Sequence, residues 1–306
     1  MKEKALSKPL AQPQQEVSQP EAKSGNVHVL ESAMKLIFFI CGFIAIGFVL
    51  VITVYLIISG LPAIREVGLV EFLFGTEWAS TAEQPKFGIL PLILTSVYGT
   101  AGAIVIGVPI GFLMAMFLSK VAPRRVANVI RPVVDLLAGI PSIVYGLFGF
   151  LLFVVACGMG FSILGGALTL AIMVLPLIMR TTEEALKSVP DNWREGSFAL
   201  GAGRLRTIFC VVLPAAVPGI LSGIILSIGR IVGESAALLY TAGTVAAIPE
   251  SLFSSGRTLS VHMYALLSEG LYVNEAHATA LVLLIMVLLI NFASGAIAAL
   301  FVRERS

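Results

Sequence analysis

Residues 36–58 read LIFFICGFIAIGFVLVITVYLII, a run of 23 residues without a charged side chain. About 20 helical residues cross the hydrocarbon core of a bilayer, so this run is long enough to span a membrane. The apolar core of a secretory signal peptide has only about 7–15 residues. We therefore expect this run to stay in the chain as a membrane anchor.

Five further apolar runs follow, at Ile89–Leu118, Val133–Ala156, Phe161–Met179, Ile208–Ile228 and Ala278–Phe301. The composition agrees with them, because 58% of residues are hydrophobic and only 12% are charged. A soluble domain carries about a quarter charged residues, so this chain has too little polar surface to cover a water-soluble globule. We expect an all-α, polytopic membrane protein with six transmembrane helices.

Lysine and arginine are unevenly distributed among the loops between these runs. The N-terminal tail, the loops after the second and fourth runs and the C-terminus hold sixteen of the 20. The loops between them hold three, and Arg230 is left near a membrane boundary. Because basic loops stay in the cytoplasm, this alternation predicts six spans with both termini cytoplasmic. A four- or five-span arrangement puts a basic loop on the wrong side.

Three parts of the chain follow from this arrangement. Residues 1–30 are rich in polar residues and proline, and we expect a disordered cytoplasmic tail there, since such a segment buries too little apolar surface to fold. Residues 31–306 form the transmembrane domain, and residues 181–206 form a cytoplasmic loop within it.

The sequence predicts no metal site and no cofactor. The cysteines and histidines lack metal-ligand spacing, and we interpret the cysteines as small apolar residues. The six are Cys41, Cys157, Cys210, His28, His262 and His277. The net charge of +2, without a basic stripe, predicts no nucleic-acid partner.

The loop at 181–206 contains a predicted short helix, Trp193–Leu200. Pro190 ends the preceding segment, and Asn192 with Glu195 has the spacing of an N-cap and its capping-box partner. Gly201 suits a helix C-cap.

Four residues of this helix are expected on one face: Trp193, Gly196, Ser197 and Leu200. A helix of about two turns is marginal in isolation, so we expect it to pack against something. Two interpretations remain at this point. The loop is either a polar linker lying on its own bundle or a docking element for a soluble partner.

The same segment resembles the EAA loop of ABC importer permeases. Glu195-Gly-Ser is followed by Gly201 and, twelve residues after it, by Leu213-Pro214, with Gly196 and Ser197 in place of the two alanines. The resemblance implies the type I ABC importer permease (MetI-like) fold. It also implies a coupling helix that sits in a cleft of an ATPase subunit, with Glu195 and Gly201 in that role.

ATP hydrolysis must come from another polypeptide. No lysine in the chain follows a glycine, so the GK[ST] ending of a phosphate-binding loop is absent from the sequence. We therefore expect this chain not to be an enzyme.

Three further segments resemble the phosphate-specific (Pst) permeases, which comprise PstC-like and PstA-like forms. They are GTEWASTAEQPKFGILP at 75–91, LLAGIPSIVYGLFGF at 136–150 and GIILSIGRIVGE at 223–234. The resemblance implies an inorganic phosphate importer in a prokaryotic inner membrane. The implied partners are an ATP-binding homodimer, a second permease subunit, an extracytoplasmic phosphate-binding protein and membrane lipid.

Arg230 and Glu234 are the candidate pathway residues. Ionisable groups at membrane depth are costly and usually face a pathway, and a guanidinium matches phosphate oxygens in a bidentate manner. A helix continuing through both residues puts them on one face, where Glu234 would orient Arg230. The alternative is an Arg–Glu pair that only anchors the helix at the outer interface.

A cluster of small residues in the third run predicts an irregular helix. Gly139, Pro141 and Gly146 favour a break or close packing there. Asp135, after Pro132, is expected at a helix start, where the dipole favours a carboxylate.

Other functions remain open on sequence alone. The EAA loop fits permeases for sulfate, molybdate or tungstate equally well. A secondary carrier and a membrane protein that reports phosphate status are the alternatives of another class.

Overall fold

The structure is a computed structural model that describes residues 24–303. Most of the predicted tail, residues 1–23, lies outside this range. The chain divides into two compact units, one ending at Ile52 and one beginning at Thr53. In chain order the elements, with η for π-helical segments, are α1 (Ser24–Val67), α2 (Leu69–Phe74), β1 (Trp78–Ala79), β2 (Lys86–Phe87), α3 (Leu90–Met116), η1 (Phe117–Val121), α4 (Arg124–Ala138), α5 (Ser142–Gly149), η2 (Phe150–Ala156), α6 (Ile163–Lys187), α7 (Asp191–Ala199), α8 (Arg204–Thr207), η3 (Ile208–Val212), α9 (Leu213–Val232), α10 (Ala236–Thr241), α11 (Leu259–Glu269) and α12 (Val273–Arg303).

The described part of the first unit is the N-terminal stretch of α1. α1 begins at Ser24, so residues 24–30 of the predicted tail are helical. An ion pair one turn apart, between Glu31 and Lys35 at 2.9 Å, supports this first part of the helix.

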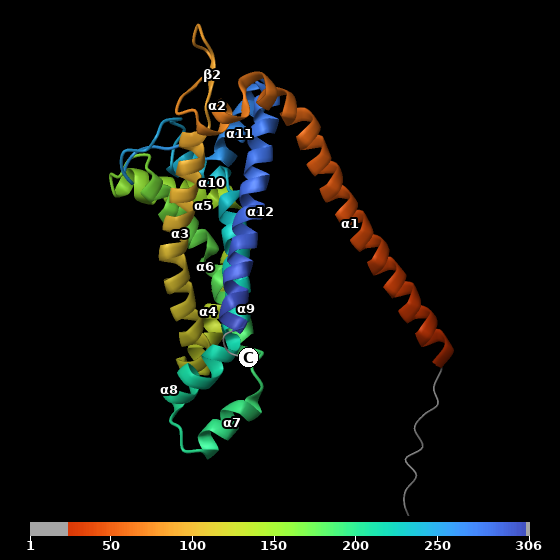
Figure 1. Cartoon of the computed structure of the whole chain (residues 1–306). Helices are drawn as coiled ribbons and strands as arrows, with labels where there is room; N and C mark the ends of the chain where they lie inside the picture. Colours follow the sequence, from red (N-terminus) through yellow and green to blue (C-terminus); the bar gives the residue numbers. More distant parts are fainter. Residues whose placement is uncertain (1–23, 304–306) are drawn as a thin grey trace, which may run out of the picture. The chain divides into compact units, whose positions relative to one another are not determined.

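In the second unit, α3, α6, α9 and α12 pack together as a bundle (Figure 1). Small residues bring the helix backbones close, as is usual between membrane helices. A methyl group built on Gly111 of α3 would lie 2.9 Å from Ile178 of α6. One built on Gly60 of α1 would lie 2.8 Å from the backbone of Ala278 in α12. The bundle therefore depends on glycine at these crossings.

Five described helices are long and apolar enough to cross a membrane, or six if one bent pair is counted as a single span. The unbroken ones coincide with five of the six predicted runs. Most of the described residues are helical and the two strands have two residues each, which confirms the all-α prediction.

The third predicted run, Val133–Ala156, is not one straight helix. α4 and α5 meet at a bend of 100° around residues 139–141. Pro141 is extended (ψ 143°) and starts α5, and proline disfavours the helical conformation in the residue before it. A methyl group on Gly146 would lie 2.8 Å from Ala237 of α10, so α5 packs closely there. Both the predicted break and the predicted close packing are confirmed.

The two ends of the bundle carry different elements. At one end, β1 and β2 form an antiparallel hairpin in which Trp78 pairs with Phe87. At the other end, α7 and α8 lie beyond the ends of the long helices (Figure 1). The end with the hairpin is called the hairpin end below.

Candidate functional site

Arg230 lines a groove on the side of the bundle. The groove has a volume of about 620 Å³, and its walls include Leu177 of α6, Leu226 of α9 and Asn291 of α12. Leu177 and Asn291 lie near the middle of their helices, α6 and α12. Arg230 is exposed to the groove, and no ion pair or hydrogen bond joins it to another residue in the range 24–303. A permanent charge therefore stands unpaired beside residues from the middle of two apolar helices.

The groove is mostly apolar, with a polar opening toward α12. A methyl group on Gly229 would lie 3.7 Å from the Asn291 side-chain oxygen, so α9 and α12 approach closely beside Arg230. An amide within an apolar helix is costly unless it faces a partner or a pathway. Asn291 was missed in the sequence analysis, although a polar residue inside the last apolar run could have indicated it.

The predicted single helix through Arg230 and Glu234 is wrong. α9 ends at Val232, with Gly233 as its C-cap, so Glu234 lies in the connection to α10. The Glu234 carboxylate accepts a hydrogen bond from the backbone N–H of Ala237 at 3.3 Å. Its backbone carbonyl accepts one from the Ser260 hydroxyl of α11 at 2.6 Å. Glu234 thus caps α10 and does not orient Arg230 from the same helical face.

The helix predicted in the loop at 181–206 is present as α7. It begins at Asp191, directly after Pro190, and has no side-chain cap. The predicted N-cap at Asn192 is therefore wrong, because Pro190, with an extended backbone (ψ 138°), is the N-cap and the helix starts two residues before the predicted Trp193. An ion pair between Asp191 and Arg194 at 2.8 Å supports the first turn.

The predicted C-cap of α7 is confirmed. Gly201 has a left-handed backbone (φ 81°), and its N–H donates to the Phe198 carbonyl at 2.9 Å. The next N–H, of Ala202, donates to the Ser197 carbonyl at 3.1 Å. These two bonds form a Schellman motif, which satisfies the last carbonyls of the helix.

The two faces of α7 have different surroundings. Trp193 and Leu200 are 53% and 90% exposed, and no atom lies near the face of Gly196. Ser197 turns inward, where its hydroxyl lies 2.9 Å from the Thr207 hydroxyl of α8. The predicted common face therefore holds for Trp193, Gly196 and Leu200 but not for Ser197. Glu195 is exposed as well.

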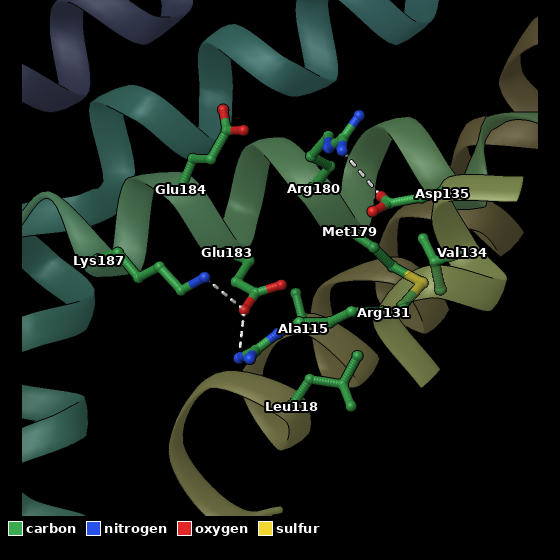
Figure 2. Close-up of a pocket in the computed structure, with 10 residues that line it drawn as sticks. All are labelled: Ala115, Leu118, Arg131, Val134, Asp135, Met179, Arg180, Glu183, Glu184 and Lys187. Atoms are coloured by element: carbon green, nitrogen blue, oxygen red, sulfur yellow. Dashed lines mark ion pairs between the residues drawn. The ribbon is translucent and has the colours of Figure 1, made fainter. Parts of the chain in front are cut away.

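A second cavity, of about 250 Å³, lies between α4, α6 and the end of α3 (Figure 2). Glu183 of α6 forms ion pairs with Arg131 of α4 at 2.6 Å and with Lys187 at 2.8 Å. Asp135 forms another with Arg180 at 2.9 Å. Figure 2 shows these side chains meeting across the two helices. These ion pairs join α4 to α6. Because the acids and bases around the cavity are paired, no excess positive charge is left there to bind an anion.

Asp135 lies in the last turn of α4 and not at a helix start, because α4 already begins at Arg124. The dipole argument made for it from sequence is therefore wrong. The α4–α6 ion pairs were also missed in the sequence analysis, since they join residues about fifty positions apart.

The hairpin end is held by aromatic contacts. The rings of Trp78 and His262 are perpendicular, with centroids 4.1 Å apart, and the Tyr272 hydroxyl donates to the Ser80 carbonyl at 2.7 Å. His262 of α11 is fully buried, and its Nδ1 lies 3.2 Å from the Arg257 guanidinium. Burial, followed by the Arg257 charge, lowers the pKa of His262 to about 3. His262 is therefore neutral at physiological pH.

Comparisons with known proteins agree with this architecture. Residues 107–306 match the family described as "Binding-protein-dependent transport system inner membrane component". The probable ABC transporter permease protein YqgH of Bacillus subtilis is 35% identical over 271 residues, covering 83% of this chain and 88% of the relative. The phosphate transport system permease protein PstA 1 of Mycobacterium tuberculosis is 38% identical, covering 71% and 76%. PstC of Mesorhizobium japonicum is 32% identical, covering 72% and 75%.

Solved structures share the fold at lower identity. The MetNI methionine ABC transporter matches with a TM-score of 0.54 and 23% identity, over 68% of this chain and 91% of that chain. A bacterial alginate ABC transporter matches with a TM-score of 0.60 and 16% identity, over 88% and 93%. Together with the family match, these likenesses confirm the predicted MetI-like fold. The chain belongs to the family of inner membrane components of binding-protein-dependent transport systems, with phosphate transport system permeases among its relatives.

Proposed function

We propose that this chain is the membrane-spanning permease subunit of an ATP-driven importer of inorganic phosphate and forms half of the translocation pathway. The observation that carries the proposal is the unpaired Arg230, which lies in the last turn of α9 and lines the groove together with Leu177 and Asn291. Relatives of both the PstA and the PstC kind support phosphate as the substrate.

The chemistry of Arg230 suits a phosphate ion in transit. Its guanidinium stays charged at any physiological pH and offers parallel N–H donors to two phosphate oxygens. A carboxylate held against it would compete with the anion, and no carboxylate contacts Arg230 in the range 24–303. Phosphate therefore gains a charge-assisted contact without first displacing a partner from Arg230.

Glu234 remains a proposed pathway residue in a different role. Its negative charge lies just past the end of α9, where it repels an anion that has moved beyond Arg230. Its hydrogen bond to Ala237 needs only an acceptor oxygen, which a glutamine also offers. Glu234→Gln thus removes the charge while keeping the cap of α10.

The groove also supports a two-subunit pathway. Leu226 is 59% exposed beside Arg230, so one side of the groove is open in the single chain. Exposing a guanidinium directly to lipid tails is costly. We propose that a second, related permease subunit closes the open side, in a heterodimer.

α7 is the proposed site of ATPase docking. Its outward face presents Trp193 and Leu200, two exposed apolar residues on a polar loop, beside the exposed Glu195. An exposed aromatic at the end of a short helix suits insertion into a cleft of a partner protein. The hydrogen bond between Ser197 and Thr207 holds the inner face to α8, so a push on α7 reaches α9 through η3.

The proposed orientation follows the basic loops. α7 and both termini are on the cytoplasmic side of the inner membrane, and the hairpin end faces outward. The hairpin and the segment around α11 are then available to an extracytoplasmic phosphate-binding protein.

The proposal is tested with Arg230 variants in the complete transporter. The chain is copurified with its ATPase, second permease and binding protein, and ATP-driven phosphate uptake is measured in proteoliposomes. Arg230→Gln should abolish uptake, Arg230→Lys should impair it because the planar fork is lost, and Glu234→Gln should impair it. Normal uptake by an assembled Arg230→Gln complex would make this arginine an interface anchor and refute the proposed role.

Coupling is tested separately. Glu195→Lys and Gly201→Asp should release or uncouple the ATPase while the chain still inserts into the membrane. The matched control is Arg206→Gln, which removes a charge from the same loop outside α7. An unchanged complex with normal ATP-driven uptake would leave α7 as a linker.

A further inference from the structure

A pocket of about 540 Å³ opens where two membrane spans end beside α7. Its walls combine three cations with an apolar rim. The cations are Lys120 of η1, Arg194 of α7 and Arg204 of α8, and the rim includes Val121, Phe198 and Leu205. This set of residues is called the basic pocket below, and it shares no residue with the Arg230 groove or the ion-paired cavity of Figure 2.

The positive charge of the basic pocket is only partly compensated. Arg194 pairs with Asp191, whose side chain is 80% exposed. The Lys120 ammonium donates to the carbonyl of Leu186 at 3.3 Å, a neutral acceptor. Arg204 is exposed and has no ion pair with any residue between 24 and 303. Two of the three cations, Lys120 and Arg204, therefore form no ion pair with the described residues.

The apolar rim faces outward. Val121 and Leu205 are 66% and 70% exposed, and Phe198 is 42% exposed. Val121 ends the span Leu90–Val121, and Leu205 lies at the start of the span Arg204–Val232. Both spans end on the basic side of the chain, so the pocket lies at the boundary between hydrocarbon and water. Apolar side chains exposed there contact lipid at no cost, whereas in water they would be costly.

We propose that the basic pocket binds the phosphate of an anionic phospholipid headgroup, with the lipid's apolar part against Val121 and Leu205. Basic pockets between membrane helices on the cytoplasmic side recognise acidic headgroups. An acidic segment of a soluble partner would match the charge but would leave this rim in water. Charge and rim together therefore favour a lipid.

A lipid bound there would have a mechanical consequence. Arg194 and Phe198 lie on the side of α7 that lines the basic pocket, while Lys120 belongs to the end of a membrane span. A single headgroup bridging them ties the docking helix to the bundle without covering its outward face. The inference holds whatever ion the transporter carries.

The test measures lipid retention by the full-length chain in detergent, using native mass spectrometry. Phosphatidylglycerol should be retained in preference to phosphatidylcholine. Each basic residue near a lipid surface contributes about 1 kcal/mol, so Lys120→Gln with Arg204→Gln should weaken phosphatidylglycerol binding roughly thirtyfold. If the double variant folds poorly, Arg204→Gln alone is used, since this position is exposed. It should weaken phosphatidylglycerol binding about fivefold.

The matched control is Arg124→Gln with Arg125→Gln, which removes two exposed charges of the same loop outside the pocket and should leave retention unchanged. Equal retention of the two lipids, or an equal loss in the control, would overturn the proposal. Displacement of phosphatidylglycerol by millimolar inorganic phosphate would also overturn it, since the site would then belong to the free ion. Displacement by the copurified ATPase would assign the pocket to an acidic protein segment and overturn it likewise.

Discussion

Two glycines in and directly after α7 should respond in opposite directions to substitution by alanine. Gly201 has a left-handed backbone (φ 81°), and Gly196 lies within α7. Apart from the adjoining backbone, no atom of the described chain lies within 4 Å of a methyl group built on either residue. Contacts with other side chains therefore play no part, and only the local backbone conformation separates the two sites.

The magnitudes follow from backbone physics. An alanine in the left-handed region costs roughly 1–2 kcal/mol, so Gly201→Ala should increase local opening of the α7 C-terminus about 5- to 30-fold. Alanine inside a helix is favoured over glycine by roughly 0.5–1 kcal/mol. Gly196→Ala should thus decrease opening of α7 about 2- to 5-fold.

Hydrogen exchange of the backbone amides in residues 193–202 measures this opening directly. The Ala202 amide, which donates to Ser197, is the most informative reporter. Gly201→Asn is the matched control, because asparagine tolerates the left-handed region better than alanine. The amides of this variant should exchange nearly as slowly as those of the native chain. Slower exchange in both alanine variants, or no change in Gly201→Ala, would refute the Schellman cap and the helix end derived from it.

Three further predictions concern other parts of the chain. The pKa of His262 falls from 6.5 in the unfolded chain to about 3 when folded. The contribution of neutral His262 to the free energy of unfolding should therefore be complete above pH 6.5 and fall by about 1.4 kcal/mol for each pH unit between 6.5 and 3. Thermal unfolding between pH 7 and 5 should show a steeper loss of stability for the native chain than for His262→Gln. A methyl group on Gly223 would overlap the Thr181 hydroxyl of α6, so Gly223→Ala should lower the free energy of unfolding by about 1–3 kcal/mol. Adding Thr181→Ala should restore part of this loss in the double variant. Gly99→Ala, where the space around the methyl group is open, should leave the thermal melt unchanged. Single cysteines at positions 83 and 255 should react with an impermeant thiol reagent added outside intact cells and one at 188 should not, whereas external labelling at 188 would contradict the six-span topology.

Sequence reasoning identified features that are fixed locally. Apolar runs of span length became helices, and Pro141 after Gly139 produced the break between α4 and α5. Gly201 capped α7 because a glycine after the last helix former readily adopts the left-handed backbone. In each case a few neighbouring residues determine the structure.

The predictions were wrong where contacts between residues far apart in the sequence determine the structure. A helix continuing through Arg230 and Glu234 was expected because the two residues are four apart, but α9 ends at Val232, and Ser260 of α11 binds the carbonyl of Glu234 and supports the turn into α10. Nothing near residue 234 in the sequence indicates that contact. Ion pairs such as Arg131–Glu183 and the position of Asn291 beside Gly229 depend in the same way on helix packing.

Competition among oxyanions in the assembled transporter tests whether this chain imports phosphate. The chain is copurified with its ATPase, second permease and binding protein, and uptake of radiolabelled phosphate is followed with and without ATP. We predict ATP-dependent uptake that excess unlabelled phosphate suppresses and that excess sulfate or molybdate leaves unchanged. Equal suppression by sulfate or molybdate, or phosphate uptake by this chain alone under an ion gradient without ATP, would contradict the account.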